Sequence, residues 1–421
     1  MKNLTKSLFI TVLALVLGSS YAVAQIAQDL QFFRPPDKRG LNVFEAPKTT
    51  DVEFEGLYVR TGGDFAIQFH ALTQSNDFAA DPLVDLSNNF ALPTANLNFD
   101  VQIENGLRMH LRTYLSSKHH SEAWVKGGYF QIDRLDFIEE GFAEEFMQNA
   151  RFRFGMDEIN YGDTHFRRSD NARAIFNPFV GNYIMDSFST EPFAEFSYFA
   201  NDIFGVVGVS NGRLNQRPLP GDDGIAMFAK LGYDSQVNED LRVRLTGSVY
   251  NSTDKGTRDY LYNGDRAGAR YYQLLTGEVS GDSDFLPRFN PRFAYQTAIQ
   301  FNPFIKFQGL EVFGVVEFVN NGDDDIGGGF NQYGAEVLYR FGADEDLYVG
   351  GRYNMVTGEQ TDASESIDIT RLNLGAGWFM TQNVLAKIEY VTSTYDGNGW
   401  NGTKFEGAEF SGVVLEAVIS F

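Results

Sequence analysis

The sequence predicts an all-β fold: a transmembrane antiparallel β-barrel of sixteen strands, with short periplasmic turns and long extracellular loops. Many segments of about ten residues alternate between apolar and polar side chains, the pattern of a strand with two different faces. Beyond the N-terminal segment, no apolar run approaches the roughly 18 residues that a membrane-spanning helix needs. Glycine (42), phenylalanine (39) and tyrosine (20) are abundant. This composition favours many short strands and turns over helices.

The N-terminal segment has the three parts of an export signal. Lys2 and Lys6 precede an apolar core at 8–17, and the sequence AVA at 22–24 supplies a small-x-small cleavage site. The core is too short to cross a bilayer as a helix. Because the chain has no cysteine, we expect no lipid anchor, disulfide or thiolate metal site. The expected organisation is a signal peptide at 1–24, a short N-terminal periplasmic extension at 25–52 and the transmembrane β-barrel at 53–421.

Sixteen alternating segments can be counted. Several are joined by short polar turns such as ENG at 104–106, in which Asn-Gly is a strong hairpin signal. Fourteen or eighteen strands are also compatible with the pattern. The segment ARYYQLLTGEVS at 269–280 could be a strand, but one extra strand would make the count odd, so we assign it to a loop. The predicted strands are 64–75, 92–104, 107–116, 123–134, 150–157, 190–200, 203–212, 225–236, 240–252, 292–302, 310–320, 331–341, 346–357, 366–380, 382–396 and 405–421.

The last predicted strand ends the chain on Phe421. A C-terminal strand that finishes on Phe resembles the signal shared by outer-membrane barrels of Gram-negative bacteria. With this terminus in the periplasm, the short turns fall on the periplasmic side and the long connections face outward. This asymmetry is typical of such barrels. We therefore expect the exported chain in the cell outer membrane, with outer-membrane lipid around it.

The segment LRMHLRTYL at 107–115 indicates which face meets lipid. Leu107, Met109 and Leu111 alternate with Arg108 and Arg112. An arginine facing lipid near the bilayer midplane costs about 2–4 kcal/mol, whereas one facing a wet lumen costs almost nothing. The arginine-bearing faces are therefore expected inside. The candidate pore-wall residues are Arg108, Arg112, Arg151, Arg153, Arg242 and Arg244.

A barrel of sixteen to eighteen strands leaves an aqueous channel. We therefore expect a porin that passes small hydrophilic solutes by passive diffusion, without a cofactor, a metal site or catalysis. The acidic segment NNGDDDIGGG at 320–329 lacks the spaced ligands of an EF-hand. His119 and His120 would point to opposite faces of a strand, and no base with an orienting partner is visible, so the chain is not expected to be an enzyme. A net charge of −22 argues against nucleic acid as a partner.

Three stretches resemble the phosphate-selective porin O and P type family: ARFRFGMDEINYGDTHFRRSDN, GVVGVSNGRLN and the following MFAKLGYD. The likeness covers the barrel loosely, from Glu53 to Phe421. It implies sixteen strands, a homotrimer, and a pore narrowed by the third and fifth outer loops. The arginine track of family members cannot be aligned position by position, so that role is not transferred. The helical extension of some members is absent, because the segment before Glu53 has three prolines and no heptads.

The third outer connection, 158–189, contains His165, Arg167, Arg168 and Arg173. If it folds inward, these residues would form the pore constriction and favour anions such as phosphate, because arginine rings select for anions and the guanidinium fork suits phosphate.

Two alternatives to an anion-preferring porin remain open. The arginines could instead pair with acidic neighbours in the same segment, which would give a nonspecific or cation-preferring porin. The net charge of the chain also favours cations. In a different class, the chain would be an occluded, surface-exposed binding scaffold or receptor. The acidic neighbours are Asp157, Glu158, Asp163 and Asp170.

Overall fold

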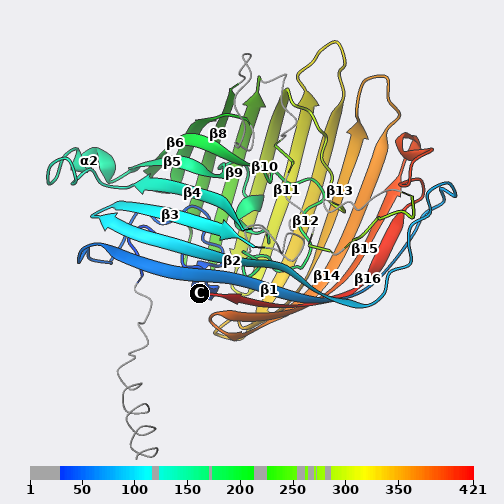
Figure 1. Ribbon diagram of the computed structural model, residues 1–421. Coiled ribbons are helices and arrows are strands. Elements are labelled where there is room, and N and C mark those ends of the chain that lie inside the picture. Colours follow the sequence, from blue (N-terminus) through cyan, green and yellow to red (C-terminus); the bar gives the residue numbers. More distant parts are fainter. Residues whose placement is uncertain are drawn as a thin grey trace, which may run out of the picture.

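The computed structural model describes residues 29–115, 123–169, 173–212, 225–253, 261–263, 270–271, 273–279 and 286–421. Within this part, sixteen strands form one closed barrel in which each strand pairs antiparallel with its neighbours in sequence (Figure 1). The predicted signal peptide lies outside the described residues. The strands are β1 (Tyr58–Ser75), β2 (Asn89–Glu104), β3 (Leu107–Tyr114), β4 (Trp124–Ile132), β5 (Ala150–Glu158), β6 (Thr190–Ala200), β7 (Ile203–Ser210), β8 (Ala226–Gln236), β9 (Leu241–Ser252), β10 (Gln296–Phe307), β11 (Leu310–Asn321), β12 (Gly329–Phe341), β13 (Leu347–Glu359), β14 (Ile367–Thr381), β15 (Val384–Asp396) and β16 (Glu409–Ser420).

The predicted number and order of strands are confirmed. The largest differences are at β1, which begins six residues earlier than predicted, and at β10, which is shifted toward its C-terminal end. Pro303 lies inside β10, where the pairing with β11 skips Asn302 and Pro303 because proline cannot donate to the ladder. The described residues of 269–280 form no strand; Gly277 makes only an isolated bridge to Leu83.

The barrel closes through the pairing of β1 with β16. At the end of β16, the N–H of Phe421 donates to the carbonyl of Gly63 at 3.0 Å, and the N–H of Gly63 donates back at 3.1 Å. Phe421, the last residue of the last predicted strand, therefore takes part in the pairing of β1 with β16 that closes the sheet.

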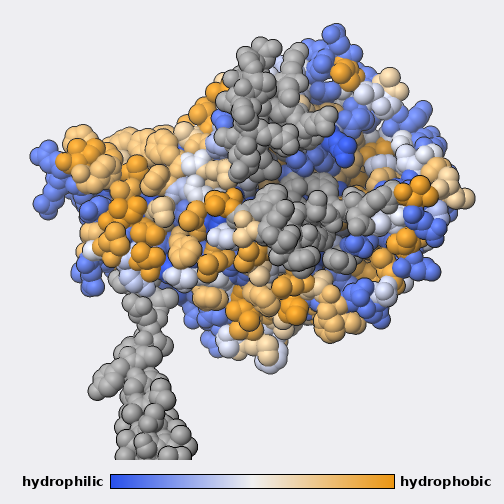
Figure 2. Space-filling model, viewed as in Figure 1, coloured by the Kyte–Doolittle hydropathy of each residue, from blue (hydrophilic) through white to orange (hydrophobic). Residues whose placement is uncertain are grey.

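The two faces of each strand follow the predicted orientation. In β3, Arg108, His110 and Arg112 are buried, whereas Leu107 and Leu111 are partly exposed on the outer face. Leu231 in β8 is 66% exposed and lies next to Lys230, which is buried. Apolar residues are spread over much of the outer wall that Figure 2 shows. No helix in the described part is long and apolar enough to cross a bilayer.

The two ends of the barrel differ. Turns such as 105–106 and 201–202 lie at one end, the short-turn end, and the long connections lie at the other. One exception at the short-turn end joins β4 to β5. It includes the short helix α2 (Glu144–Met147) and projects sideways from the barrel (Figure 1). Phe146 of this connection stacks on Phe196, on the outer face of β6, with ring centroids 6.2 Å apart.

Residues 29–52, the expected extension, contact the barrel closely. We call this segment the strap. It contains a short 3-10 helix, Lys38–Gly40, and it makes hydrogen bonds to side chains of the inner wall, as in the bond from Asn42 to Glu311 of β11. Sequence analysis expected a periplasmic extension at 25–52 and did not foresee that its described residues lie along the inner wall of the barrel.

Candidate functional site: a luminal cavity lined by arginines

The third outer connection enters the barrel. We call residues 159–189 the inward loop. Every residue from 174 to 189 is buried, and so is most of the described remainder. The loop packs against the inner faces of β8 to β15. Its aromatic side chains occupy places where the wall has glycine: the Cβ of an alanine at Gly334 would lie 2.6 Å from the ring of Tyr183, and one at Gly375 would lie 3.1 Å from the ring of Phe179.

Wall side chains also bind the backbone of the inward loop. Glu389 of β15 accepts hydrogen bonds from the N–H of Val180 at 2.8 Å and of Gly181 at 3.3 Å. The ammonium of Lys387 donates to the carbonyls of Ala174, Asn177 and Phe179. Buried backbone groups need such partners, so the polar inner wall is complementary to this particular loop path.

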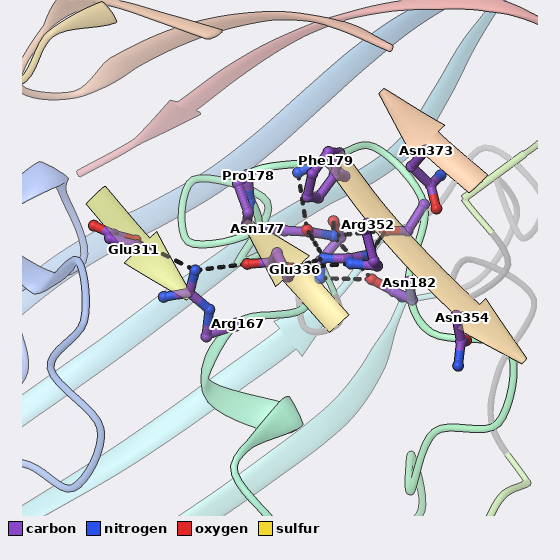
Figure 3. Close-up of polar contacts among 12 residues, drawn as sticks. Arg167, Asn177, Pro178, Phe179, Asn182, Glu311, Glu336, Arg352, Asn354 and Asn373 are labelled. Atoms are coloured by element: carbon purple, nitrogen blue, oxygen red, sulfur yellow. Dashed lines mark hydrogen bonds and ion pairs between the residues drawn. The ribbon is translucent and has the colours of Figure 1, made fainter. Parts of the chain in front are cut away.

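Arg167 anchors the middle of the loop (Figure 3). Its guanidinium lies 2.7 Å from Glu336 of β12 and 3.4 Å from Glu311 of β11. Arg352 of β13 donates to the other oxygen of Glu336 at 2.7 Å and to the carbonyl of Gly181 at 2.7 Å. All these side chains are buried, so two arginines and two carboxylates form one desolvated network between loop and wall.

Arg168 and Asp163 are held in similar networks. Arg168 lies 2.9 Å from Glu158 and 2.7 Å from Asp186. Asp163 receives Lys230 of β8 at 2.9 Å and Arg244 of β9 at 2.8 Å. Burial raises the pKa of the Asp163 carboxyl, but the two cations outweigh burial and leave this pKa below its usual range. Asp170, a possible partner named from the sequence, lies outside the described residues.

The fifth outer connection also reaches the lumen. Tyr262 donates to Glu317 of β11 at 2.7 Å, and Tyr161 of the inward loop donates to the same oxygen at 3.0 Å. Tyr271 donates to Glu389, and Arg270 pairs with Glu416 of β16. Its described tyrosines thus bond this connection to the wall.

Between the inward loop and the wall of β1 to β6 lies a cavity of about 130 Å³. Seven arginines and six carboxylates line it, an excess of one positive charge in a protein whose formal net charge is −22. The arginines are Arg34, Arg60, Arg108, Arg112, Arg151, Arg153 and Arg173, and the carboxylates are Glu45, Asp64, Asp100, Asp157, Glu158 and Glu195.

The charges in the cavity are partly paired. Arg112 lies 3.1 Å from Asp157, Arg153 lies 3.5 Å from Glu195, and Arg173 lies 3.6 Å from Glu158. Several buried guanidinium nitrogens have no hydrogen-bond partner among the described residues. These donors are Nε of Arg112, Nε of Arg153, Nε and Nη1 of Arg108 and Nη1 of Arg34.

The structure divides the sequence-predicted site residues into two groups. Six of them line the cavity together: Arg108, Arg112, Arg151, Arg153, Arg173 and His165. The other four lie elsewhere. Arg167 and Arg168 are buried in the networks described above and do not line the cavity. Arg242 and Arg244 lie on β9, where both contact Asp234.

His165 differs from the arginines around the cavity. Burial lowers the pKa of its imidazole well below the usual value, and the charge of Lys230 lowers it further. The ring is therefore neutral near pH 7. Its Nδ1 has no hydrogen-bond partner in the described part of the chain.

Among the charged residues of the cavity that sequence reasoning missed are Arg34, Glu45 and Arg60. Arg34 and Glu45 belong to the strap, whose prolines and lack of alternation gave no signal that it would enter the lumen. Arg60 lies in the part of β1 that precedes the predicted start of that strand. A fuller reading of the alternation at 58–63 could have placed Arg60 inside.

Comparisons with known proteins bear on the fold. No family model matches the chain, and no curated protein matches its sequence. Among solved structures, the anion-selective porin of Comamonas acidovorans aligns with a TM-score of 0.54 and 10% identity over 87% of this chain and 100% of that one. OmpF of Salmonella typhi, in complex with daunomycin, aligns with 0.54 and 11% over 88% and 100%. The outer membrane channel DcaP of Acinetobacter baumannii aligns with 0.51 and 13% over 88% and 99%. The chain therefore has the barrel fold of outer-membrane porins.

Proposed function

We propose that this chain is an outer-membrane porin that passes small hydrophilic solutes by diffusion and prefers anions such as phosphate. The observation that carries the proposal is the cavity beside the inward loop, where seven arginines face six carboxylates. Solutes would pass between the inward loop and the wall of β1 to β6. The short-turn end would face the periplasm.

The preference for anions rests on the unpartnered guanidinium donors. Arg108 and Arg112 reach the cavity from β3, and each keeps at least one buried N–H without a partner in the described part. A buried donor without a partner costs about 1–3 kcal/mol, so an anion that accepts these bonds would be favoured there. The forked geometry of arginine suits the oxygens of phosphate and carboxylate.

The carboxylates of the cavity favour a nonspecific or cation-preferring porin as the second reading. Asp157 and Glu195 neutralise part of the arginine charge, and opposed charges across a lumen need not select strongly. The whole protein is acidic, so its long-range field attracts cations. The sign of the selectivity depends on how narrow the arginine-lined passage is in solution.

A third reading is an occluded surface scaffold or receptor. The strap, the inward loop and the fifth connection all occupy the lumen, which supports this reading. An occluded barrel would carry almost no current.

Planar bilayers test all three readings. The mature chain, purified from outer membranes, is reconstituted, and the single-channel conductance and the reversal potential are measured in a KCl gradient. We expect discrete conductance steps, a reversal potential on the anion side, and a decrease of the chloride current when phosphate is added. Steps with a cation-side potential would support the second reading, and silence in a correctly folded protein would support the third.

The narrower resemblance to the phosphate-selective O and P type, the homotrimer that it implies and the release of residues 1–24 belong to this proposal. Cross-linking of the detergent-solubilised protein tests the trimer, and N-terminal sequencing of the mature protein tests the cleavage. A monomer would contradict the proposed trimer. A mature chain that retains residue 1 would contradict the proposed cleavage.

A further inference from the structure

The strap follows the inner rim of the barrel at the short-turn end. Its two ends meet, because the side-chain amide of Gln31 donates to the carbonyl of Val52 at 2.9 Å and to Asn105, in the β2–β3 turn, at 3.1 Å. The strap therefore starts and finishes at the same point of the wall.

Between these ends, the first half of the strap runs along the side opposite β4. Ser420 of β16 donates to the carbonyl of Pro36 at 2.6 Å. The N–H of Lys38 donates to Gln382, in the β14–β15 turn, at 3.0 Å. Asn42 then donates to Glu311 of β11 at 2.7 Å.

The second half of the strap returns along the remaining wall. Glu45 pairs with Arg244 of β9 at 2.8 Å and with Lys230 of β8 at 3.4 Å. Arg151 of β5 donates to the carbonyls of Ala46 at 2.7 Å and of Pro47 at 2.9 Å. The strap thus forms a ring that is bonded to the wall around the short-turn mouth.

The strap also contacts the inward loop and holds it in place. The guanidinium of Arg34 lies 3.8 Å from the centre of the Phe176 ring and donates to the carbonyl of Phe166 at 3.0 Å. The ring of Phe44 meets that of Phe166 edge-on, 5.8 Å between centroids. The strap supplies part of the cavity lining, including Arg34, Glu45 and Ala46.

We propose that the strap is a second constriction of the channel, at its periplasmic exit, and that Arg34 is a selectivity residue supplied from outside the barrel. This proposal rests on the proposed channel function. A solute that passes the inward loop must leave past the strap, and Arg34, which lines the cavity from the strap, brings a positive charge to this point. Arg34 lies where the strap meets the inward loop, so under this proposal its charge acts at a narrow part of the passage.

Cysteine accessibility provides the test, because the chain has no native cysteine. Ala46→Cys places a thiol on the cavity side of the strap, and its backbone bond to Arg151 is unaffected. The control, Thr49→Cys, lies on the same strap but is exposed and lines a separate pocket beside the β4–β5 connection. Both variants are treated in bilayers with a cationic and an anionic methanethiosulfonate reagent, and mass spectrometry confirms the labelling.

We expect labelling of Ala46→Cys to reduce the conductance by about twofold or more, and the two reagents to move the reversal potential in opposite directions. Labelled Thr49→Cys should conduct like the unmodified channel. Arg34→Gln should move the reversal potential toward cations. Arg39→Gln should not, because Arg39 is an exposed strap residue that is paired with Asp29 and Asp37 and does not line the cavity.

Labelled Ala46→Cys with unchanged current, in a channel that conducts, would overturn the strap proposal and leave the porin proposal intact. A silent wild-type protein would overturn the porin proposal instead. In that case a variant lacking residues 29–50 decides about the strap, with folding checked by the heat-dependent gel shift of the barrel. Current in the deletion variant would show that the strap is the barrier, and continued silence would refute this role.

Discussion

Arg167 of the inward loop lies 2.7 Å from Glu336 of β12, and both side chains are buried. This pair joins a loop that enters the lumen to a strand on the far side of the barrel. It also explains why an arginine predicted at the constriction can instead act as an anchor.

Replacing Arg167 by Met should loosen the inward loop. The change leaves part of the charge of Glu336 and Glu311 unpaired in a buried site, which costs up to about 3–5 kcal/mol. We expect a lower melting temperature on heated gels and a noisier single-channel current. Arg134→Met, on the exposed β4–β5 connection, is the matched control and should change neither. An Arg167→Met channel as stable and quiet as the wild type would contradict the anchoring role.

The cavity arginines should govern selectivity more than those on β9. Arg112→Gln and Arg153→Gln each remove a positive charge from the cavity lining, so the reversal potential should move toward cations. Arg242→Gln removes a charge that is paired with Asp234 and does not line the cavity, so its shift should be much smaller. Equal shifts in all three variants would mean that the solute path does not follow the cavity.

Asp163 should stabilise the barrel in a pH-dependent way. Its folded-state pKa is lowered by Lys230 and Arg244, so its contribution is present above the unfolded pKa of about 4 and is lost as the pH falls toward the folded value. Asp163→Asn should therefore melt at a lower temperature than the wild type at pH 7 and at pH 5. The difference should shrink only below about pH 4, and a difference that vanished between pH 7 and 5 would argue against this account.

The wall glycines that leave room for the aromatic rings of the inward loop should set the position of that loop. A side chain at Gly334 would collide with the ring of Tyr183, so Gly334→Leu should displace the loop and change the single-channel conductance. Gly205→Ala, whose Cβ would meet only the carbonyl of Lys230 at 4.0 Å, is the control. Unaltered conductance in Gly334→Leu would mean that the loop tolerates the larger residue without moving.

A charged side chain on the outer face should destabilise the barrel. Leu231 is 66% exposed on the outer face of β8, so Leu231→Arg should lower the free energy of unfolding in lipid vesicles by about 2–4 kcal/mol if the site lies near the midplane. Leu231→Phe should have little effect. Equal stability of the Arg and Phe variants would show that this face does not meet hydrocarbon.

Much of the fold could be read from local patterns. The alternation in 107–115 placed Arg108 and Arg112 inside, because the cost of an arginine in lipid is large and the period of a strand is two. The same reasoning could not separate Arg112, which lines the cavity, from Arg244, which is bound to Asp163 and Glu45. Both face inward, and the difference depends on which loop covers each.

By itself, the sequence determined the antiparallel barrel class and the polarity of its two faces, because these follow from side-chain period and the solvation of charge. It favoured sixteen strands, and the closed structure decided between that number and fourteen or eighteen. Only the tertiary structure decided what occupies the lumen. The path of the inward loop depends on distant partners such as Glu336 and Glu389, and the strap reaches the rim through bonds to strands that follow it by up to several hundred residues. Contacts between residues so far apart in the chain leave no periodic signal, so the cavity itself, and the contribution of Arg34 to it, appear only when the barrel is closed.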